Sequence, residues 1–508
     1  MLADYFARSA VAAAQVIEGF DEQRFREHLQ NTPVGVSAPA PSREAEALLD
    51  LTVRLIARLY PQLAIEVPEP HASRLRDLAV AINPAIELVD SAELGIVVGD
   101  GPAFAESVFV GSDGWDALLG TQYPLSTGNT ANPFGAGAAA CLSAGALFRR
   151  VFLTDWAQRA ETDLRFSVLD GERAEAPTGV PDIPPALEIE AVLVGAGAIG
   201  HGALWALGRT PARGTVHVVD PEPVELSNLQ RYVLAERRHE GAVKVNLAAK
   251  LAGTLRFEPH EGDLGAFLVA EGYGWPAMLL ALDSARDRVG AQASLPRWIA
   301  NAWTQPGDLG VSGHSAFGAD GACVACMYLP EGPAKNEDEL VAEALGIPQH
   351  LMKVRTGLHT GQPVGRPLLD AIADAVGQPI EALLPYEART IRELYVEGFC
   401  GGAVIPLGEA GKPHAAAHDV HVPLAHQSAL AGVMLAASLF RYARFGAPDL
   451  TKITRIDVLR PVAQYPTQPL KARRDGRCIC DDPDFRSVYA RRYTASAYPV
   501  PSPSAGAG

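Results

Sequence analysis

The stretch EAVLVGAGAIGHGALWALG, residues 190–208, decides the fold, because it passes from an apolar strand through a glycine turn into an apolar helix. Gly195, Gly197 and Gly200 have the spacing Gly-x-Gly-x-x-Gly at the junction of the two segments. Glycine permits a tight turn there and lets main-chain N–H groups at the helix N-terminus approach a phosphate or a ribose. The stretch predicts a nucleotide site, with a purely structural turn as the alternative.

The alternation of strands and helices continues after the glycine turn. A second strand, TVHVVD at 215–220, ends in Asp220, and the apolar strand PAMLLAL at 276–282 is followed by Asp283. This alternation predicts an α/β fold with a Rossmann-like parallel sheet and flanking helices. Asp220 comes twenty residues after Gly200, where such folds place a carboxylate that binds ribose hydroxyls.

The residues behind Asp220 favour a triphosphate over a dinucleotide. The segment DPEPVELSNLQRY at 220–232 contains Asn228 and Arg231, and Lys244 follows on the next predicted helix. A lysine supplies a point charge and an arginine supplies a planar fork, which together suit several phosphate groups. A solvated helix face is the alternative for either cation alone, and NAD or FAD is the alternative ligand for the glycine turn alone.

These residues resemble the superfamily of ThiF, MoeB and the ubiquitin-activating enzymes. VDPEPVELSNLQRY is similar to its signature Asp-x-Asp-x-Val-x-x-Ser-Asn-Leu-x-Arg, with Glu222 in place of the second aspartate. ALDSARDR resembles the family's Asp-Ser element and contains Asp283 and Arg288. The resemblance covers 189–330 and 420–490, and it implies a ThiF-type adenylation domain.

The resemblance implies ATP-dependent adenylation, in which a carboxylate attacks the α-phosphorus of ATP and gives an acyl adenylate and pyrophosphate. Magnesium and cationic side chains stabilise the charge that spreads over the phosphates. The carboxylate is already ionised at neutral pH, so no general base is needed. By resemblance, the phosphates contact Asn228, Arg231 and Lys244, the ribose contacts Asp220, and the magnesium ion binds Asp283.

Two close pairs of cysteines predict a metal site. Cys323-x-x-Cys326 and Cys478-x-Cys480 are far apart in the sequence, and paired thiolates of this kind suit structural, tetrahedral Zn²⁺. A four-cysteine zinc site is frequent in the resembled family, although its second pair is usually Cys-x-x-Cys. Unligated thiols or a redox pair are the alternatives.

Two cysteines fall outside these pairs. Cys400, in VEGFCGG, lies between the pairs, where ubiquitin-activating enzymes carry their thioester cysteine. The resemblance implies that Cys400 attacks the acyl adenylate and holds the product as a thioester, and a buried cysteine at a glycine turn is the alternative. Cys141 lies in an Ala-rich helix and is interpreted as a core residue.

Two segments of the chain are alike, NPFGAGAAACLSAGALFRRVF at 132–152 and VPLAHQSALAGVMLAASLFR at 422–441. The similarity predicts a two-copy architecture, and two unrelated Ala-rich helices are the alternative. The first copy has no glycine fingerprint, so it should not bind nucleotide. The predicted parts are a degenerate adenylation-like half (1–174), the nucleotide-binding domain (186–330), an insert with Cys400 (331–420), a segment that completes the domain (421–492) and a disordered tail (493–508).

The composition of the 508 residues excludes several classes of protein. Hydrophobic residues make up 48% and charged residues 20% of the chain, which is typical of a globular protein. The formal net charge of −16 argues against nonspecific binding to nucleic acid or to an anionic membrane. No apolar run is long enough for a membrane span, and we expect a cytoplasmic protein.

Further candidates are weaker. An arginine of the other half often completes the ATP site in the resembled family, and Arg74 and Arg76 are among the possibilities. His201 follows the glycine turn, where a phosphate contact and a packing role are both open. A cluster of four histidines matches no metal site and is interpreted as a structural or solvated loop: His414, His418, His421 and His426.

The predicted function is adenylation of the C-terminal carboxylate of a ubiquitin-like protein, with a conjugating enzyme as a further partner. The Ala-, Arg- and Pro-rich composition suggests a bacterium, and analogy then suggests a ubiquitin-like conjugation system, some of which act in antiviral defence. A sulfur-carrier protein or a peptide precursor is an alternative substrate. An NAD-dependent oxidoreductase and a non-catalytic scaffold are alternatives from other classes.

Overall fold

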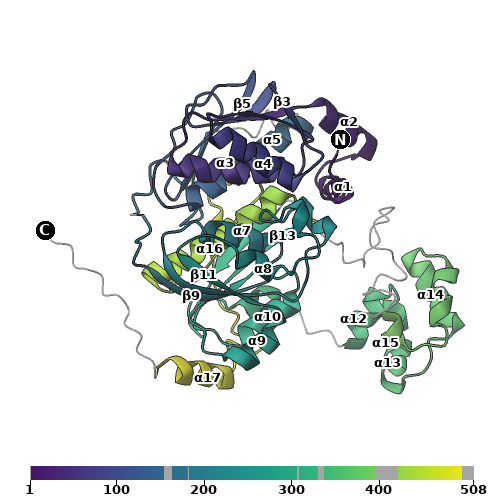
Figure 1. The fold of residues 1–508 in the computed structure, drawn as a ribbon. Helices are drawn as coiled ribbons and strands as arrows, with labels where there is room; N and C mark the ends of the chain where they lie inside the picture. The colour runs from purple at the N-terminus through teal and green to yellow at the C-terminus, as the bar shows by residue number, and fades with distance from the viewer. Residues whose placement is uncertain are drawn as a thin grey trace. The chain divides into compact units, whose positions relative to one another are not determined.

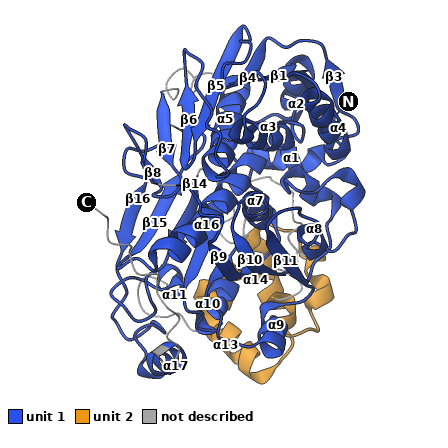
Figure 2. Cartoon of the chain, turned by 60° about the vertical axis from the view of Figure 1, so that its left-hand side comes forward, with its two compact units in different colours: residues 1–329, 422–508 blue, residues 330–421 orange. Residues whose placement is uncertain are grey.

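The computed structural model describes residues 2–153, 163–180, 182–305, 308–329, 337–395, 422–460 and 462–494. The candidates Cys400, His414, His418 and His421 lie outside these residues. The chain divides into two units, residues 1–329 with 422–508 and residues 330–421, which Figure 2 shows in different colours.

The first unit contains a sheet with the strand order β3-β2-β1-β4-β5-β6-β7-β8. Neighbouring strands are parallel from β3 to β5 and antiparallel from β5 to β8. Its strands are β1 (Val34–Ser37), β2 (Gln62–Glu66), β3 (Glu87–Val89), β4 (Leu94–Val98), β5 (Glu106–Asp113), β6 (Asp116–Gly120), β7 (Leu164–Ser167) and β8 (Glu172–Arg173).

A second sheet in the same unit repeats this plan, with the order β11-β10-β9-β12-β13-β14-β15-β16. Its pairs are parallel from β11 to β13 and antiparallel from β13 to β16. The two sheets therefore share strand order and strand direction throughout. The strands are β9 (Glu188–Val194), β10 (Arg213–Val219), β11 (Leu255–His260), β12 (Met278–Leu280), β13 (Ile299–Gln305), β14 (Asp308–Gly313), β15 (Thr451–Ile456) and β16 (Thr467–Leu470).

Helices cover both sheets, and four of them, α3, α5, α7 and α16, lie between the sheets in Figure 1. Apolar residues of both halves meet there in one continuous core, which explains why the two halves form a single unit. The helices of this unit are α1 (Phe6–Ala14), α2 (Glu22–Asn31), α3 (Arg43–Ile56), α4 (His71–Ile82), α5 (Phe134–Phe152), α7 (Ala198–Leu207), α8 (Val245–Ala248), α9 (Leu264–Glu271), α10 (Ala285–Ala293), α11 (Val324–Tyr328), α16 (Ala425–Phe445) and α17 (Pro483–Thr494).

Helices α7 and α16 cross at very short range because glycines line the contact. A Cβ atom on Gly432 would lie 2.2 Å from the main-chain oxygen of Ile199, and one on Gly202 would lie 2.6 Å from that of Ala429. Only a bare main chain fits at these two positions. Helix α16 also contacts α5, so the two similar segments of the sequence pack against each other.

A buried carboxylate joins the two halves. Asp50 on α3 accepts hydrogen bonds from Arg54 (2.9 Å), from the indole of Trp205 (2.8 Å) and from Arg209 (2.6 Å). Burial alone would raise the pKa of Asp50, but the charges of Arg209 and Arg54 and the Trp205 bond outweigh it and lower the pKa to about 2. The ionised carboxylate is therefore the form that stabilises the fold.

The second unit is helical and has its own core. Its helices are α12 (Glu337–Ala344), α13 (Leu351–Thr360), α14 (Arg366–Val376) and α15 (Ile391–Glu393). The most deeply buried apolar residues are Leu345, Ile347, Val354, Leu369, Ile372, Leu383 and Leu394. None of the helices described in either unit combines the length and the apolar character that crossing a bilayer requires.

We predict that Asp50→Asn destabilises the protein near pH 7 by about 2 kcal/mol, the free energy that corresponds to the pKa shift. The folded-state pKa of Asp50 lies below its ordinary value of 3.8. Its stabilising contribution is therefore complete above about pH 4 and is lost as the pH falls to about 2. Urea unfolding from pH 7 to pH 2.5 measures both effects.

The variant should show a flatter loss of stability below pH 4 than the unsubstituted protein. Glu69→Gln is the control, because Glu69 pairs with Arg76 on the exposed surface and should leave the unfolding curve little changed. Identical pH profiles for Asp50→Asn and the unsubstituted protein would mean that another group titrates.

Candidate nucleotide and metal sites

The glycine turn lies at the point where the strand order of the second sheet reverses. The chain proceeds from β9 outward to β10 and β11, and then returns to place β12 on the other side of β9. Because these strands are parallel, their carboxyl ends share one edge of the sheet. A crevice at such a switch point is the usual ligand site of open α/β sheets.

Each of the three glycines of the turn meets a different steric constraint. Gly195 has a positive φ of 96°, and a Cβ atom there would lie 2.6 Å from the main-chain oxygen of Ala281. A Cβ atom on Gly200 would lie 2.2 Å from the oxygen of Gly195. Gly197 caps α7, and a Cβ atom on it would have the hydroxyl of Tyr232, at 3.7 Å, as its nearest neighbour. The first and third glycines close the turn, and Gly197 leaves open space before the helix.

Asp220 is fixed at the end of β10 by the main chain of the turn. One carboxylate oxygen accepts from Ala196 N (2.7 Å) and the other from Glu222 N (2.9 Å). The side chain is largely buried. This arrangement holds a carboxylate beside the glycine turn, as the sequence predicts for a ribose-binding residue.

Lys244 lies beside the same carboxylate. Its ammonium group is 2.5 Å from Glu222 and 3.9 Å from Asp220. Burial opposes the charge of Lys244, but the phenol of Tyr232, the bond to Glu222 and the charge of Asp220 outweigh it and raise the pKa. Lys244 therefore stays cationic at neutral pH, as a phosphate-binding lysine must.

Arg231 and Asn228 take different roles in the segment that follows Asp220. Asn228 Oδ1 accepts from Glu225 N (3.0 Å), and this bond shapes the short helix η1 (Leu226–Gln230). Arg231 follows η1, and one of its Nη atoms is buried without a hydrogen-bond partner among the described residues. An orphaned, buried guanidinium nitrogen beside a nucleotide turn fits an anionic ligand.

Arg8 is an arginine that the first half brings close to Arg231, and sequence reasoning did not single it out. Helix α1 contacts η1, Arg8 Nε is buried without a hydrogen-bond partner among the described residues, and the charge of Arg8 adds to burial in lowering the pKa of Arg231. Arg76 instead pairs with Glu69 on the surface (2.8 Å). The only sequence signal for Arg8 is a lone cation in the Ala-rich helix FARSAVAAA.

Asp283 lies on the loop after β12 and is exposed. The loop is tethered to the turn, because Ala281 N donates to Val194 O (2.9 Å). Arg288 is buried and donates to Leu282 O and to Ala302 O (2.8 Å). Arg288 therefore positions the loop that carries Asp283.

Two of the weaker candidates are packed side chains. His201 is buried, accepts a hydrogen bond from Leu234 N through Nδ1 (3.2 Å) and packs against the tilted ring of Tyr232. Burial and neighbouring cations hold its pKa well below its usual value. His426 is buried near the start of α16, and burial lowers its pKa to about 3. Cys141 is fully buried in α5, as the sequence predicts for a core residue.

The corresponding crevice of the first half is closed. The loop after β1 contains Pro39 and Pro41, which lack the N–H groups that bind phosphate. A Cβ atom on Gly101 would lie 2.9 Å from Ala38 Cα, so the loop after β4 packs directly on the loop after β1. The described residues of the first half thus hold no equivalent of the open space at Gly197.

The four paired cysteines come together in one buried cluster, and their sulfur atoms all lie within 4.8 Å of one another. The sulfur–sulfur distances include 3.3 Å for Cys326–Cys478 and 3.8 Å for Cys323–Cys326. Four sulfurs bound tetrahedrally at about 2.3 Å from a zinc ion would be about 3.8 Å apart. The cluster, completed by Cys480, therefore fits a Zn²⁺ ion.

Comparison with known proteins follows the two halves of the chain. Residues 178–257 match the ThiF family, and residues 37–153 match prokaryotic E2 family C. The tRNA N6-threonylcarbamoyladenosine dehydratase TcdA of E. coli aligns at 21% identity over 22% of this chain and 47% of its own, with a TM-score of 0.19. PaaA aligns at 18% identity over 33% of this chain and 56% of its own, with a TM-score of 0.22. The matched parts span about half of each of these structures.

The match places residues 178–257, which contain the glycine turn, in the ThiF family. The uncharacterized protein y4jF of Sinorhizobium fredii is 40% identical over 522 residues, which cover 99% of both chains. The chain belongs to the same family as that protein, along its whole length.

We predict that the purified protein contains about one zinc ion per chain and that Cys478→Ser lowers both the zinc content and the melting temperature. The metal would tie the segment before α17 to α11, and the variant removes one of four ligands. Elemental analysis and thermal unfolding measure the two effects.

Cys400→Ser is the control, because Cys400 belongs to neither of the two close cysteine pairs in the sequence. It should keep the zinc content of the unsubstituted protein. A protein that carries no metal and whose four clustered thiols all react with a thiol reagent in the folded state would contradict the assignment.

Proposed function

We propose that this protein is an ATP-dependent adenylyltransferase that activates a carboxylate of a protein substrate. The observation that carries the proposal is the convergence of Gly197, Asp220 and Lys244 at the switch point of the second sheet. The match of residues 178–257 to the ThiF family supports the same reaction. An oxidoreductase that binds NAD would not need the buried cations behind the turn.

In the proposed reaction, an oxygen of the substrate carboxylate attacks the α-phosphorus of ATP, and the bond to the departing pyrophosphate breaks. Lys244 and Arg231 stabilise the negative charge that develops on the phosphates. Asp220 binds the ribose, and the main-chain N–H groups at the start of α7 bind phosphate. Asp283 would hold Mg²⁺, which shields the charge of the triphosphate.

The first half contributes arginines to the region of this site, while its own corresponding crevice is closed. Arg8 on α1 brings a further positive charge to the region of Arg231. Arg58, which follows α3, donates to Leu229 O (2.6 Å) and Ala235 O (2.7 Å), which shapes the chain between Asp220 and Lys244. We therefore expect one nucleotide per chain.

We predict that calorimetry with Mg-ATP gives a stoichiometry of one and that Lys244→Ala and Arg8→Ala each weaken ATP binding at least tenfold, about 1.4 kcal/mol. Each variant removes a cation that we expect to contact the phosphates. Lys250→Ala and Arg24→Ala are matched controls on exposed positions of the same regions, and they should bind ATP normally.

Exchange of labelled pyrophosphate into ATP, in the presence of the substrate protein, tests the chemistry itself. Binding of ATP without exchange would favour a non-catalytic scaffold, and binding of NAD in place of ATP would reject the proposal.

The substrate class that we propose is the C-terminal carboxylate of a ubiquitin-like protein. The resemblance to ubiquitin-activating enzymes and the match of residues 37–153 to prokaryotic E2 family C support a conjugation system with a further E2-like partner. The single cysteine of that matched region is Cys141, which is buried and has a raised pKa because of burial. The first half therefore offers no thiol for a thioester.

Cys400 is the carrier that we propose. Its thiolate would attack the acyl carbon of the adenylate, form a thioester and release AMP. We predict that Cys400→Ala abolishes a covalent adduct with the substrate that thiols can cleave, while pyrophosphate exchange continues. Non-reducing gel electrophoresis measures the adduct.

Cys141→Ala serves as the comparison and should still form the adduct. An adduct that persists in Cys400→Ala would exclude Cys400 as the carrier. Loss of exchange together with the adduct would place Cys400 in the adenylation step instead.

A further inference from the structure

Tyr232 is the side chain that borders the open space at Gly197. It follows Arg231, and its main-chain N–H donates to Asn228 O (3.0 Å). The side chain is 4% exposed. Its hydroxyl is the nearest group to a Cβ atom built on Gly197, at 3.7 Å. A largely buried phenol therefore presents its polar end to the start of α7.

Two cations lie over the ring of Tyr232. Lys244 Nζ is 5.3 Å and Arg231 Cζ is 5.6 Å from the ring centre, within the range at which an aromatic face attracts a cation. Burial lowers the pKa of both cations, and the phenol is the largest of the contributions that oppose burial. Tyr232 thus favours the charged form of both side chains beside the glycine turn.

The polar side chains around the phenol ring supply hydrogen-bond donors. A bond between Tyr232 and Lys244 contributes to the raised pKa of Lys244, and an ammonium group can only donate. The ring of His201 lies 4.6 Å from that of Tyr232, and its Nδ1 accepts from Leu234 N, so the neutral ring carries its hydrogen on Nε2. The hydroxyl oxygen of Tyr232 accepts from Lys244, which leaves the hydroxyl hydrogen for an acceptor on another side.

The first half has no counterpart of Tyr232. Only residues 67–70 separate β2 from α4, whereas residues 220–244 separate β10 from α8 and include the tyrosine. The crevice of the first half is also the one that its own loops fill. The tyrosine therefore occurs in the half whose crevice stays open.

We propose, on the basis of the adenylyltransferase function proposed above, that the hydroxyl of Tyr232 donates a hydrogen bond to a phosphate oxygen of ATP at Gly197. An ionised phosphate offers acceptor oxygens, which match a site where the main-chain N–H groups of α7, the cations and the hydroxyl all donate. Lys244 orients the hydroxyl, because its ammonium group takes the acceptor side of the oxygen. Tyr232 is thereby a phosphate-binding residue as well as a support for Lys244.

Calorimetry on the full-length protein with Mg-ATP and with adenosine tests this role in Tyr232→Phe. Phenylalanine keeps the ring beneath both cations and removes only the hydroxyl. We expect Mg-ATP to bind about tenfold more weakly, because a hydrogen bond to a charged group is lost. Adenosine has no phosphate and should bind as it does to the unsubstituted protein.

Tyr232→Leu is a second variant that removes the ring as well. It should weaken the binding of Mg-ATP further than Tyr232→Phe, because Lys244 and Arg231 lose the aromatic face. Thermal unfolding of both variants measures the accompanying change in stability.

Tyr5→Phe is the matched control for the loss of a buried hydroxyl. Tyr5 belongs to the same apolar cluster as Tyr232 and is 3% exposed. Its hydroxyl donates to Ile82 O (3.4 Å) and not toward the glycine turn. Tyr5→Phe should bind Mg-ATP normally.

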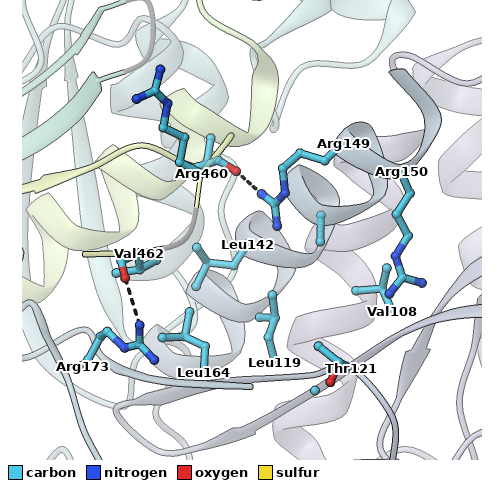
Figure 3. Close-up of a pocket in the computed structure, with 13 residues that line it drawn as sticks. Val108, Leu119, Thr121, Leu142, Arg149, Arg150, Leu164, Arg173, Arg460 and Val462 are labelled. Atoms are coloured by element: carbon cyan, nitrogen blue, oxygen red, sulfur yellow. Dashed lines mark hydrogen bonds between the residues drawn. The ribbon is translucent and has the colours of Figure 1, made fainter. Parts of the chain in front are cut away.

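Arg173→Gln is the control for a general loosening between the two halves. Arg173 lines a separate pocket, which Figure 3 shows, and donates there to Val462 O (3.1 Å). Arg149 of the same pocket donates to Val458 O. Loss of the Arg173 contact should leave the binding of Mg-ATP unchanged.

Equal binding of Mg-ATP by Tyr232→Phe and the unsubstituted protein would overturn the role of Tyr232 and leave the proposed function in place. An equal loss of Mg-ATP and adenosine binding would make Tyr232 a structural residue and would also overturn it. An unsubstituted protein that binds no Mg-ATP would instead reject the proposed function, and the role of Tyr232 with it.

Discussion

The close crossing of α7 and α16 is the constraint on which the rest of the first unit depends. Gly202 and Gly432 let the two main chains touch, so α16 is seated directly behind the helix whose N-terminus faces the crevice. The segment after Asp220 is tied to the same place, since Gln230 donates to Pro423 O (3.3 Å). A side chain at either glycine would move α7, and with it the main-chain N–H groups beside Gly197.

The two halves share one strand order, but they differ at the crevice where the strand order reverses. One crevice keeps an open glycine turn, and the other is filled by its own loops. Side chains cross between the halves in both directions. Asp50 of the first half accepts hydrogen bonds from Trp205 and Arg209 of the second, and Arg58 of the first half donates to the main-chain oxygens of Leu229 and Ala235. The two halves therefore depend on each other, because removal of either would expose the core that they share.

The sequence predicts well the features that depend on neighbours in the chain. The turn at Gly195, the carboxylate at Asp220 and the clustered cysteines follow from local spacing, and the structure brings each set together. Arg8 could not be predicted because it lies more than two hundred residues from Arg231 and belongs to a helix with no motif. The contacts made by the loops after β7 and β15 could not be predicted either. Only the structure shows that Asp170 binds Arg441 of α16 and that Val458 O accepts from Arg149 of α5.

The position of α16 in the chain has a consequence for synthesis. Translation delivers the glycine turn and strands β9 to β14 first, then the helical insert, and only afterwards α16, which covers α7, and strands β15 and β16. Until then the nascent chain lacks one side of its central layer, and the apolar surfaces of α5 and α7 stay unprotected. Such a chain completes its core late, at the stage when incomplete proteins are prone to aggregate, because the segment that begins with α16 is translated after the parallel strands of both sheets.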